Sequence, residues 1–240
     1  MTTETTNAEF QPIAAGAVRV RNPRLRRLLA LAIAHLPGSG ARRACYALLM
    51  GYRFGPGTRI GFGVQIAVDS FEAGSGVTIR RSTTFIGPIA VRLGDKAFIG
   101  RGNQIECGEG AAMANVRHMN YARRFTVGRD CLINEGHLFD VLGEIRIGDG
   151  SWVAGFASQF LTHGAGTMDR DIRIGSRCFL GSAVRFAPGS AVGDEVIVAM
   201  GAVVTKRITQ DRVVLGGVPA RVIKAREDDD RHSFHKTWEG

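Results

Sequence analysis

The sequence predicts an all-β protein, a parallel β-helix built as a solenoid of six-residue repeats, with a short helical cap before it. Glycine accounts for 32 of the 240 residues, roughly twice its usual share. Between residues 57 and 215 neither a helical period nor a strand period persists, but apolar residues recur at every sixth position. A small residue follows almost every one of them, which points to a regular turn rather than to chance.

The clearest run of this repeat begins at Ile174. Its apolar positions are Ile174, Leu180, Phe186, Val192, Val198 and Val204, and the residues after them are Gly175, Gly181, Ala187, Gly193, Ala199 and Thr205. Three such hexapeptides form one triangular coil, with the apolar residue inward and the small residue letting the backbone turn the corner. Stacked coils then bury one continuous aliphatic column.

Interruptions of the repeat predict two loops. The pattern apolar-Arg-apolar-Gly begins at Val91, Ile145 and Ile172, with a variant at Phe125, and each occurrence is interpreted as the start of a coil. The spacing between starts exceeds three hexapeptides most at two places, so loops are expected near 107–124 and 160–171. Long loops on a rigid solenoid are where function tends to lie.

The ends of the chain differ from the repeats. Asn22-Pro23 is expected to open a helix that Pro37-Gly38 ends, and 41–52 is expected to form a second helix. Both helices would cover the open edge of the first coil. The predicted division is therefore a flexible N-terminus over 1–16, a helical cap over 17–56, the β-helix over 57–218, and a C-terminal extension with a charged tail over 219–240.

Charge and cysteine content narrow the partners. The formal net charge of +9 favours an anionic partner. The basic N-terminal region could dock on the inner face of an anionic membrane, or its arginines could simply lie over apolar neighbours. Its arginines are Arg19, Arg21, Arg24, Arg26, Arg27, Arg42, Arg43 and Arg53. Nucleic acid is not expected, since no binding motif is present. Four separated cysteines and a polar N-terminus predict free thiols in the cytoplasm.

Two segments resemble a known superfamily. Residues 196–206, followed by 214–223, resemble the C-terminal signature of the hexapeptide-repeat acyltransferases, which are left-handed β-helix enzymes. Residues 143–149 through 160–163 resemble the active-site coil of the sugar O-acetyltransferase branch, which contains the maltose, galactoside and colanic-acid-type enzymes. This resemblance implies acetyl-CoA-dependent transfer of an acetyl group to a sugar or glycan hydroxyl, without a metal. It also implies a homotrimer that binds acetyl-CoA between neighbouring prisms.

The same resemblance implies roles for individual residues. His163, on the second predicted loop, would be the general base. The acetyl-CoA contacts would be Phe179, Ser182, Met200, Gly201, Thr205 and Lys206, and the acceptor contacts would be Asn134, Glu135 and Asp140. Asp140 could orient His163, bind an acceptor hydroxyl, or serve only as a corner residue.

Other functions remain open at this level. An N-acyltransferase acting on an amino sugar would need the same residues. A zinc hydratase on the same kind of prism would need His118, His137 and His163 to converge, although His137 is expected to face outward. A non-catalytic β-helix scaffold would need none of them.

Overall fold

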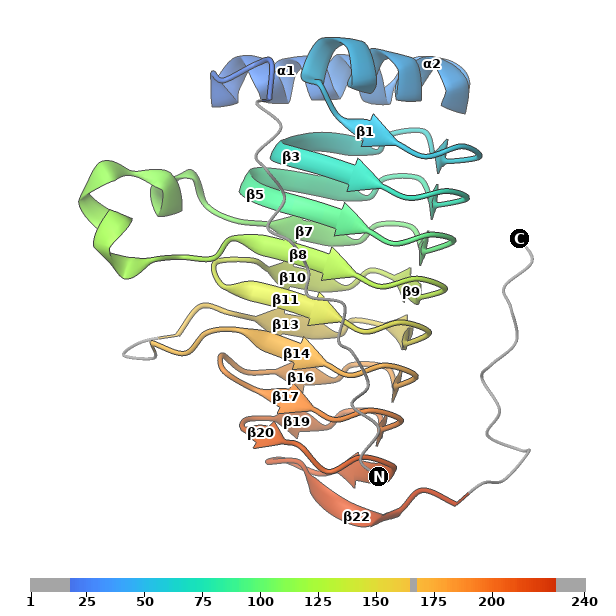
Figure 1. The fold of residues 1–240 in the computed structure, drawn as a ribbon, viewed down its shortest axis with the longest axis vertical. Coiled ribbons are helices and arrows are strands. Elements are labelled where there is room, and N and C mark those ends of the chain that lie inside the picture. Colours follow the sequence, from blue (N-terminus) through green and yellow to red (C-terminus); the bar gives the residue numbers. More distant parts are fainter. Residues whose placement is uncertain (1–17, 165–167, 228–240) are drawn as a thin grey trace, which may run out of the picture.

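The computed structural model describes residues 18–164 and 168–227 (Figure 1). The predicted flexible N-terminus and most of the charged tail lie outside these residues. The described chain forms a triangular β-helix in which almost all strands pair in parallel, with two helices across its first coil. The predicted fold class is confirmed.

The prism has three faces, and each strand pairs with the equivalent strand one coil away. Face I contains β2 (Arg59–Ile60), β4 (Thr78–Ile79), β6 (Phe98–Ile99), β9 (Leu132–Glu135), β12 (Trp152–Phe156), β15 (Phe179–Leu180), β18 (Ile197–Val198) and β21 (Val213–Gly216). The remaining strands form one sheet that bends round a corner into faces II and III.

Two long strands, β3 (Gln65–Ala73) and β5 (Thr84–Leu93), run along both faces of the bent sheet. Face II continues with β7 (Gln104–Glu106), β10 (Leu138–Asp140), β13 (Gln159–Leu161), β16 (Arg185–Phe186) and β19 (Val203–Val204). Face III consists of β1 (Arg53–Phe54), then β8 (Arg124–Val127), β11 (Glu144–Ile147), β14 (Ile172–Ile174), β17 (Ala191–Val192) and β20 (Arg207–Ile208).

The strand register confirms the six-residue repeat and the predicted coil starts. On face III, Phe125 pairs with Ile145, and Ile145 with Ile172, while Val91 pairs with Phe125. On face II, Phe139, Phe160 and Phe186 are stacked in successive coils, with ring centroids 4.6 and 5.2 Å apart. All of these side chains are fully buried, so the apolar positions do form one continuous core.

A small residue is required after each apolar residue, but for a different reason than expected. Gly148 has an ordinary φ, but a Cβ on it would lie 2.6 Å from the carbonyl carbon of Gly175 in the next coil. The left-handed backbone falls two residues later, at Gly150 (φ +67°) and at Arg177 (φ +53°) in the equivalent position. Close stacking of coils therefore selects the glycine, and the turn itself is made by its neighbours.

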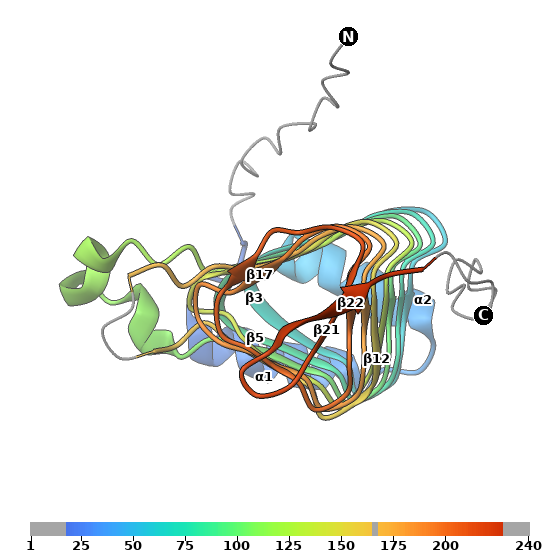
Figure 2. The ribbon, with the colours of Figure 1, turned by 90° about the horizontal axis from the view of Figure 1, so that it is seen from below.

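Two loops leave the prism at the corner between faces II and III, which we call the loop corner (Figure 2). The first follows β7 and contains the 3₁₀ helices η2 (Glu109–Ala112) and η3 (Ala114–Met119). The second follows β13 and returns at β14. Both positions agree with the sequence prediction. The tight corner between faces I and II, where no loop leaves the described prism, is called the pocket corner below.

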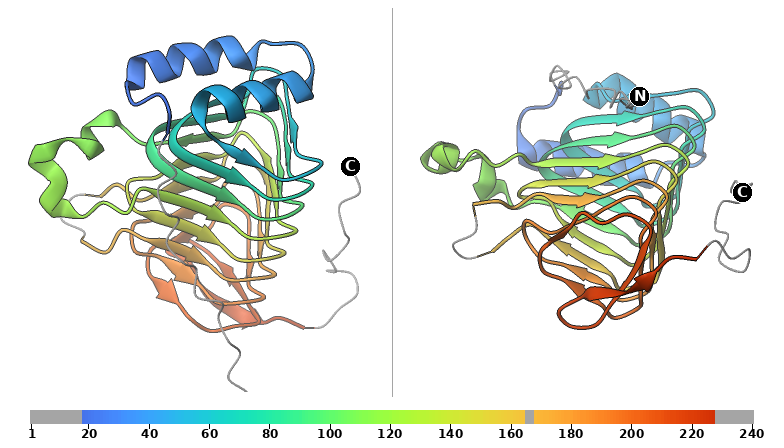
Figure 3. Two further views of the ribbon diagram at one scale, coloured as in Figure 1. Left: turned by 45° about the horizontal axis from the view of Figure 1, so that its top comes forward. Right: turned by 60° about the horizontal axis from the view of Figure 1, so that its bottom comes forward.

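Both ends of the prism are covered. Helix α1 (Pro23–Ala34) begins after Asn22, whose side chain accepts the backbone N–H groups of Arg24 and Leu25. Helix α2 (Ser39–Cys45) continues into the π-helical turn η1 (Tyr46–Met50), and all three segments lie across the first coil (Figure 3). At the other end β22 (Arg221–Ala225) pairs antiparallel with β21. No helix in the described part of the chain is long and apolar enough to cross a membrane.

Candidate active site

The candidate site lies at the loop corner, where β13 ends and the second loop begins. Because β10 and β13 pair in register, Leu161 lies beside Asp140 in the neighbouring coil. The next residue, Thr162, is fully buried, and its hydroxyl donates to the Asp140 carbonyl oxygen at 2.6 Å. The same hydroxyl accepts the N–H groups of Leu142 and Gly143 at 2.7 and 2.9 Å. Thr162 therefore fixes the point at which the loop leaves the prism.

His163 follows directly and lies against the Asp140 carboxylate. Asp140 Oδ2 accepts the His163 backbone N–H at 2.9 Å and lies 3.5 Å from the imidazole Nδ1. The histidine side chain is 73% exposed and the aspartate 22%. A carboxylate on the Nδ1 side stabilises a proton there and leaves Nε2 as the nitrogen turned away from it. Of the roles considered for Asp140, this contact favours orientation of His163.

A buried thiol lies near the same carboxylate. Cys107 is 4% exposed, at the foot of the first loop. Burial, and then the negative charge of Asp140, raise the pKa of its thiol to about 12. The thiol therefore stays protonated near neutral pH and cannot compete with His163 as a base or serve as a thiolate nucleophile.

The two loops contact each other outside the prism. The Arg170 guanidinium carbon, from the second loop, lies 5.1 Å from the centre of the Tyr121 ring in the first. Arg170 is 9% exposed and its guanidinium also donates to the Met168 carbonyl oxygen. The contact between these two residues was not predicted. Both loops leave the repeat at the same phase, after Ile105 and Phe160, and this shared phase was the available signal that they would meet.

The predicted acceptor contacts do not all come together. Asp140 is at the loop corner with His163, whereas Asn134 and Glu135 end β9 at the pocket corner. Glu135 forms an ion pair with Arg101 at 2.5 Å. Between the two corners lies face II, a separation of about 15 Å along the extended chain. In a single chain these residues do not surround one ligand.

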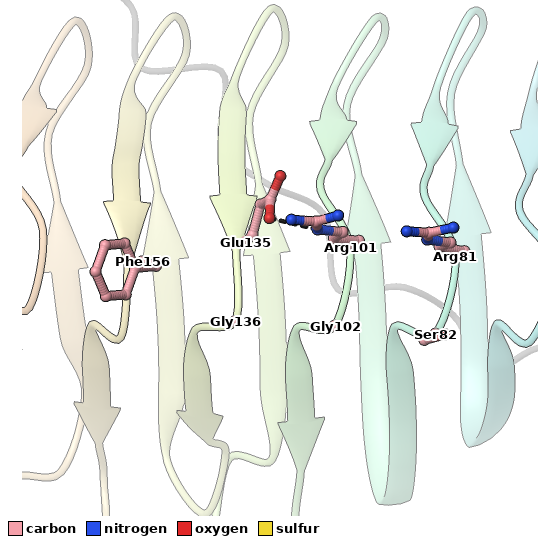
Figure 4. A pocket seen from close by; sticks show the side chains of 7 residues that line it. All are labelled: Arg81, Ser82, Arg101, Gly102, Glu135, Gly136 and Phe156. Atoms are coloured by element: carbon pink, nitrogen blue, oxygen red, sulfur yellow. Dashed lines mark hydrogen bonds and ion pairs between the residues drawn. The ribbon is translucent and has the colours of Figure 1, made fainter.

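Glu135 lines an open pocket of about 330 Å³ instead. Figure 4 shows Arg81, Arg101, Glu135 and Phe156 on four successive coils at the pocket corner. Arg81 forms no ion pair with a carboxylate in the described part of the chain. This pocket was not predicted from the sequence, although Arg81 and Arg101 are the residues two positions after the inward Ile79 and Ile99.

The predicted acetyl-CoA contacts are divided in the same way. Ser182, Met200 and Gly201 lie at the pocket corner in adjacent coils, where the Gly201 N–H donates to the Ser182 carbonyl oxygen at 2.9 Å. Phe179 lies on face I, in β15. Thr205 and Lys206 follow β19 at the loop corner, two strand spacings beyond β13, which is about 10 Å along the prism.

His137 is buried, so the expectation that it faces outward is wrong. It is 1% exposed, and its Nδ1 accepts the Ser158 N–H at 3.1 Å. Burial lowers its pKa to about 4. It lies directly before β10 at the pocket corner, whereas His163 is at the loop corner and His118 is in η3, so the three histidines do not converge. The described residues contain no group of three or more metal-binding side chains.

Comparisons with known proteins find similarity to hexapeptide-repeat proteins and to acetyltransferases. The family model for the hexapeptide repeat of succinyl-transferase matches residues 171–206. Galactoside O-acetyltransferase from Escherichia coli is 40% identical over 67 residues, which is 28% of this chain and 32% of that protein. Chloramphenicol acetyltransferase from Agrobacterium fabrum is 30% identical over 117 residues, 45% of this chain and 55% of that protein.

Among solved structures, a hexapeptide-repeat acetyltransferase from Vibrio cholerae, in complex with acetyl-CoA, is 19% identical. That match covers 86% of this chain and 88% of the other, with a TM-score of 0.49. Of the two sequence relatives, the chain spans only 32% of the length of the first and 55% of the length of the second. The predicted resemblance to hexapeptide-repeat acyltransferases is confirmed.

Proposed function

We propose that the protein is an acetyl-CoA-dependent O-acetyltransferase that acts on a hydroxyl of a sugar or glycan. The observation that carries this proposal is the pair formed by His163 and Asp140, an exposed imidazole held by a carboxylate at the foot of a loop. The similarity to galactoside O-acetyltransferase and chloramphenicol acetyltransferase supports the reaction class.

The reaction needs one base that also serves as an acid. His163 Nε2 takes the proton of the acceptor hydroxyl while its oxygen attacks the thioester carbonyl carbon. Asp140, beside Nδ1, stabilises the imidazolium that forms. The tetrahedral intermediate collapses with cleavage of the carbon–sulfur bond, and the imidazolium returns the proton to the departing thiolate. The products are the acetyl ester and free CoA, with no net proton uptake.

The positions of the other predicted contacts support a homotrimer. Asp140, His163, Thr205 and Lys206 share one corner, while Asn134, Glu135, Ser182, Met200 and Gly201 share another. If the pocket corner of one copy faces the loop corner of its neighbour, the two groups form one site between copies. This arrangement follows the family resemblance, and it gives the predicted contacts at the two corners a role that the single chain cannot.

Calorimetric titration of the purified chain with acetyl-CoA, in the presence of a chelator, tests the donor. We expect micromolar binding at about one site per chain. Absence of binding would overturn the assignment of acetyl-CoA.

Turnover with a panel of sugar hydroxyls and amino sugars tests the base and the acceptor. His163→Ala should lower kcat by ~10² or more while leaving acetyl-CoA affinity unchanged. His35→Ala, which changes an exposed histidine of the cap, is the matched control. Wild-type turnover by His163→Ala would show that another group is the base, and products formed only on amines would replace O-acylation with N-acylation.

A further inference from the structure

The positive charge of the chain is concentrated at one end of the prism. Residues 18–68 contain nine arginines and no lysine, aspartate or glutamate. The chain has 31 basic and 22 acidic residues, so the rest of it holds 22 of each and sums to zero. This segment forms the helical cap and the first coil (Figure 3). The whole formal net charge of +9 therefore belongs to the capped end.

Helix α1 directs leucines away from the prism. Ala30 and Ile33 pack into the core, with 0% and 3% of their surface exposed. At about 3.6 residues per turn, Leu28 lies on the opposite side of the helix, and it is 66% exposed. Leu25 and Leu31 flank it and are 49% and 45% exposed. An ordinary surface helix carries polar residues on this side.

The second helical segment repeats this arrangement. Arg42, Tyr46 and Met50 are buried toward the prism. Leu48 lies on the opposite side of the segment and is 66% exposed, and Leu49 beside it is 48% exposed. Both segments lie across the same end of the prism (Figure 1), and the exposed leucines of each lie opposite its buried side chains, so we name these leucines together the cap surface. It consists of Leu25, Leu28, Leu31, Leu48 and Leu49.

The arginines around the cap surface fall into two groups. Arg26 pairs with Asp69, Arg27 with Glu109, and the Arg42 guanidinium donates to the Ile60 carbonyl oxygen, so these three hold the cap to the prism. Arg21, Arg24 and Arg43 form no ion pair with a carboxylate in the described residues. Their charges remain for an external anion.

We propose that the cap surface docks on an anionic lipid bilayer. Leucines interleaved with arginines on a helix that lies flat match the interfacial region, where apolar side chains enter the acyl boundary and guanidinium groups meet lipid phosphates. A protein partner would have to combine an apolar surface with many carboxylates. An anionic bilayer presents an apolar acyl region and negatively charged headgroups over its whole surface. The long axis of the prism then stands on the membrane.

This orientation has a consequence that rests on the proposed function. The Arg27–Glu109 ion pair, at 3.1 Å, joins α1 to the first loop, and Tyr121 and Arg170 join that loop to the second. The loop corner therefore runs from the cap to His163. Between β3 and β13 there are four strand spacings, so His163 would stand roughly 20 Å beyond the first coil. A glycan attached to a membrane lipid is the acceptor class that fits this height.

Flotation of the full chain with lipid vesicles tests the docking without any acetyl donor. Vesicles of phosphatidylcholine alone are compared with vesicles that contain about 30% phosphatidylglycerol, at low and high salt. The wild-type chain should bind the anionic vesicles at least about tenfold more tightly, and salt should weaken this binding. Equal binding to both vesicles, or none to either, would overturn the proposal.

Variants at the two ends of the prism locate the surface. Leu28→Ser with Leu48→Ser should lower vesicle affinity about tenfold or more, since both side chains are exposed and the fold should persist. Val218→Ser with Ile223→Ser, at the far end and 74% and 63% exposed, is the matched control. A thermal midpoint for each variant checks folding. Wild-type affinity in the cap variant would overturn the docking surface.

The electrostatic part is tested separately. Arg21→Gln with Arg24→Gln should weaken binding to the anionic vesicles and reduce its salt dependence, whereas Arg221→Gln with Lys224→Gln, which removes two exposed charges at the far end, should leave both unchanged. Equal loss from both ends would show that net charge alone causes the binding. Because vesicle binding and acetyl-CoA titration use different readouts, either proposal can fail while the other stands.

Discussion

The loop corner and the pocket corner are built from the same repeat, yet they have different freedom. At the pocket corner the chain passes from face I to face II in a few residues, with Gly102 and Gly136 at positive φ. At the loop corner two coils extend into loops, and between them Val141 to Gly143 make a short connection. The strands must keep a fixed path to pair with the next coil. Loops that carry functional residues can therefore be inserted only at a corner where the chain leaves the prism and returns to it.

An insertion distinguishes the two corners most strongly. A Gly-Ser pair inserted after Gly102 should destabilise the fold by about 4 kcal/mol or more, because it displaces the buried Asn103 from its bonds to Gly100 and Asn134. The same pair after Met113, which is 58% exposed between η2 and η3, should cost less than about 1 kcal/mol. Urea denaturation measures both. Equal costs would remove the distinction between the corners.

Acid should affect the pocket corner through His137. Its pKa is lowered to about 4 in the fold, from 6.5 for the free side chain. The unfolded chain binds the proton first, so the stability present above pH 6.5 is lost as pH falls toward 4, by about 3 kcal/mol in total. Unfolding free energies at pH 7 and 4.5 should therefore differ less for His137→Asn than for the wild type. An unchanged difference would show that another group is responsible.

The loop corner depends on Thr162 for its shape. Thr162→Val leaves the buried N–H groups of Leu142 and Gly143 without this acceptor, at a cost of about 2 kcal/mol. Thr78→Val, on the outward side of β4, should change stability by less than about 0.5 kcal/mol. Thermal unfolding compares the two. A cost for Thr162→Val no larger than that control would mean the hydroxyl does not hold the loop.

The smallest effect concerns the contact between the loops. A double-mutant cycle with Tyr121→Leu and Arg170→Gln should give a coupling of about 0.5–1 kcal/mol, the range for a cation over an aromatic ring. If the two substitutions have additive effects on the free energy of unfolding, the loops do not stabilise each other. The contacts of Thr162, rather than those of the first loop, would then position the loop that carries His163.

The sequence predicted the solenoid well because its repeat depends on single residues at fixed spacing. Phe139 could be placed in the core from its phase alone, and so could the two loops. Phe160 could not, because a step of six residues from Val153 ends at Gln159, and a register shift in β12 brings Phe160 to the inward position instead. His137 was misplaced because it lies two residues before an inward position, on a corner where the chain turns its side chain into the prism. Its bond to Ser158 connects residues in different coils, which no local pattern records.

In the candidate site, too, the features that follow from the repeat could be predicted, and those that depend on contacts between distant segments could not. The pairing of Asp140 with His163 follows from the strand register, and it is one of the three roles expected for Asp140 from the sequence. The contact between Tyr121 and Arg170 depends on how two long loops fold above the prism, so no repeat could predict it. The division of the predicted contacts between two corners also emerged only when the coils were closed into three faces.

Because the coils stack at a fixed pitch, the prism acts as a ruler. The cap closes one end and β22 the other, so His163 stands at a set number of coils from α1. Adding or removing one coil between α1 and β7 would change the distance from the cap to the site by about 5 Å without altering any residue of the site. Reach and chemistry are therefore separate properties of this architecture, and repeat number alone can adjust the first.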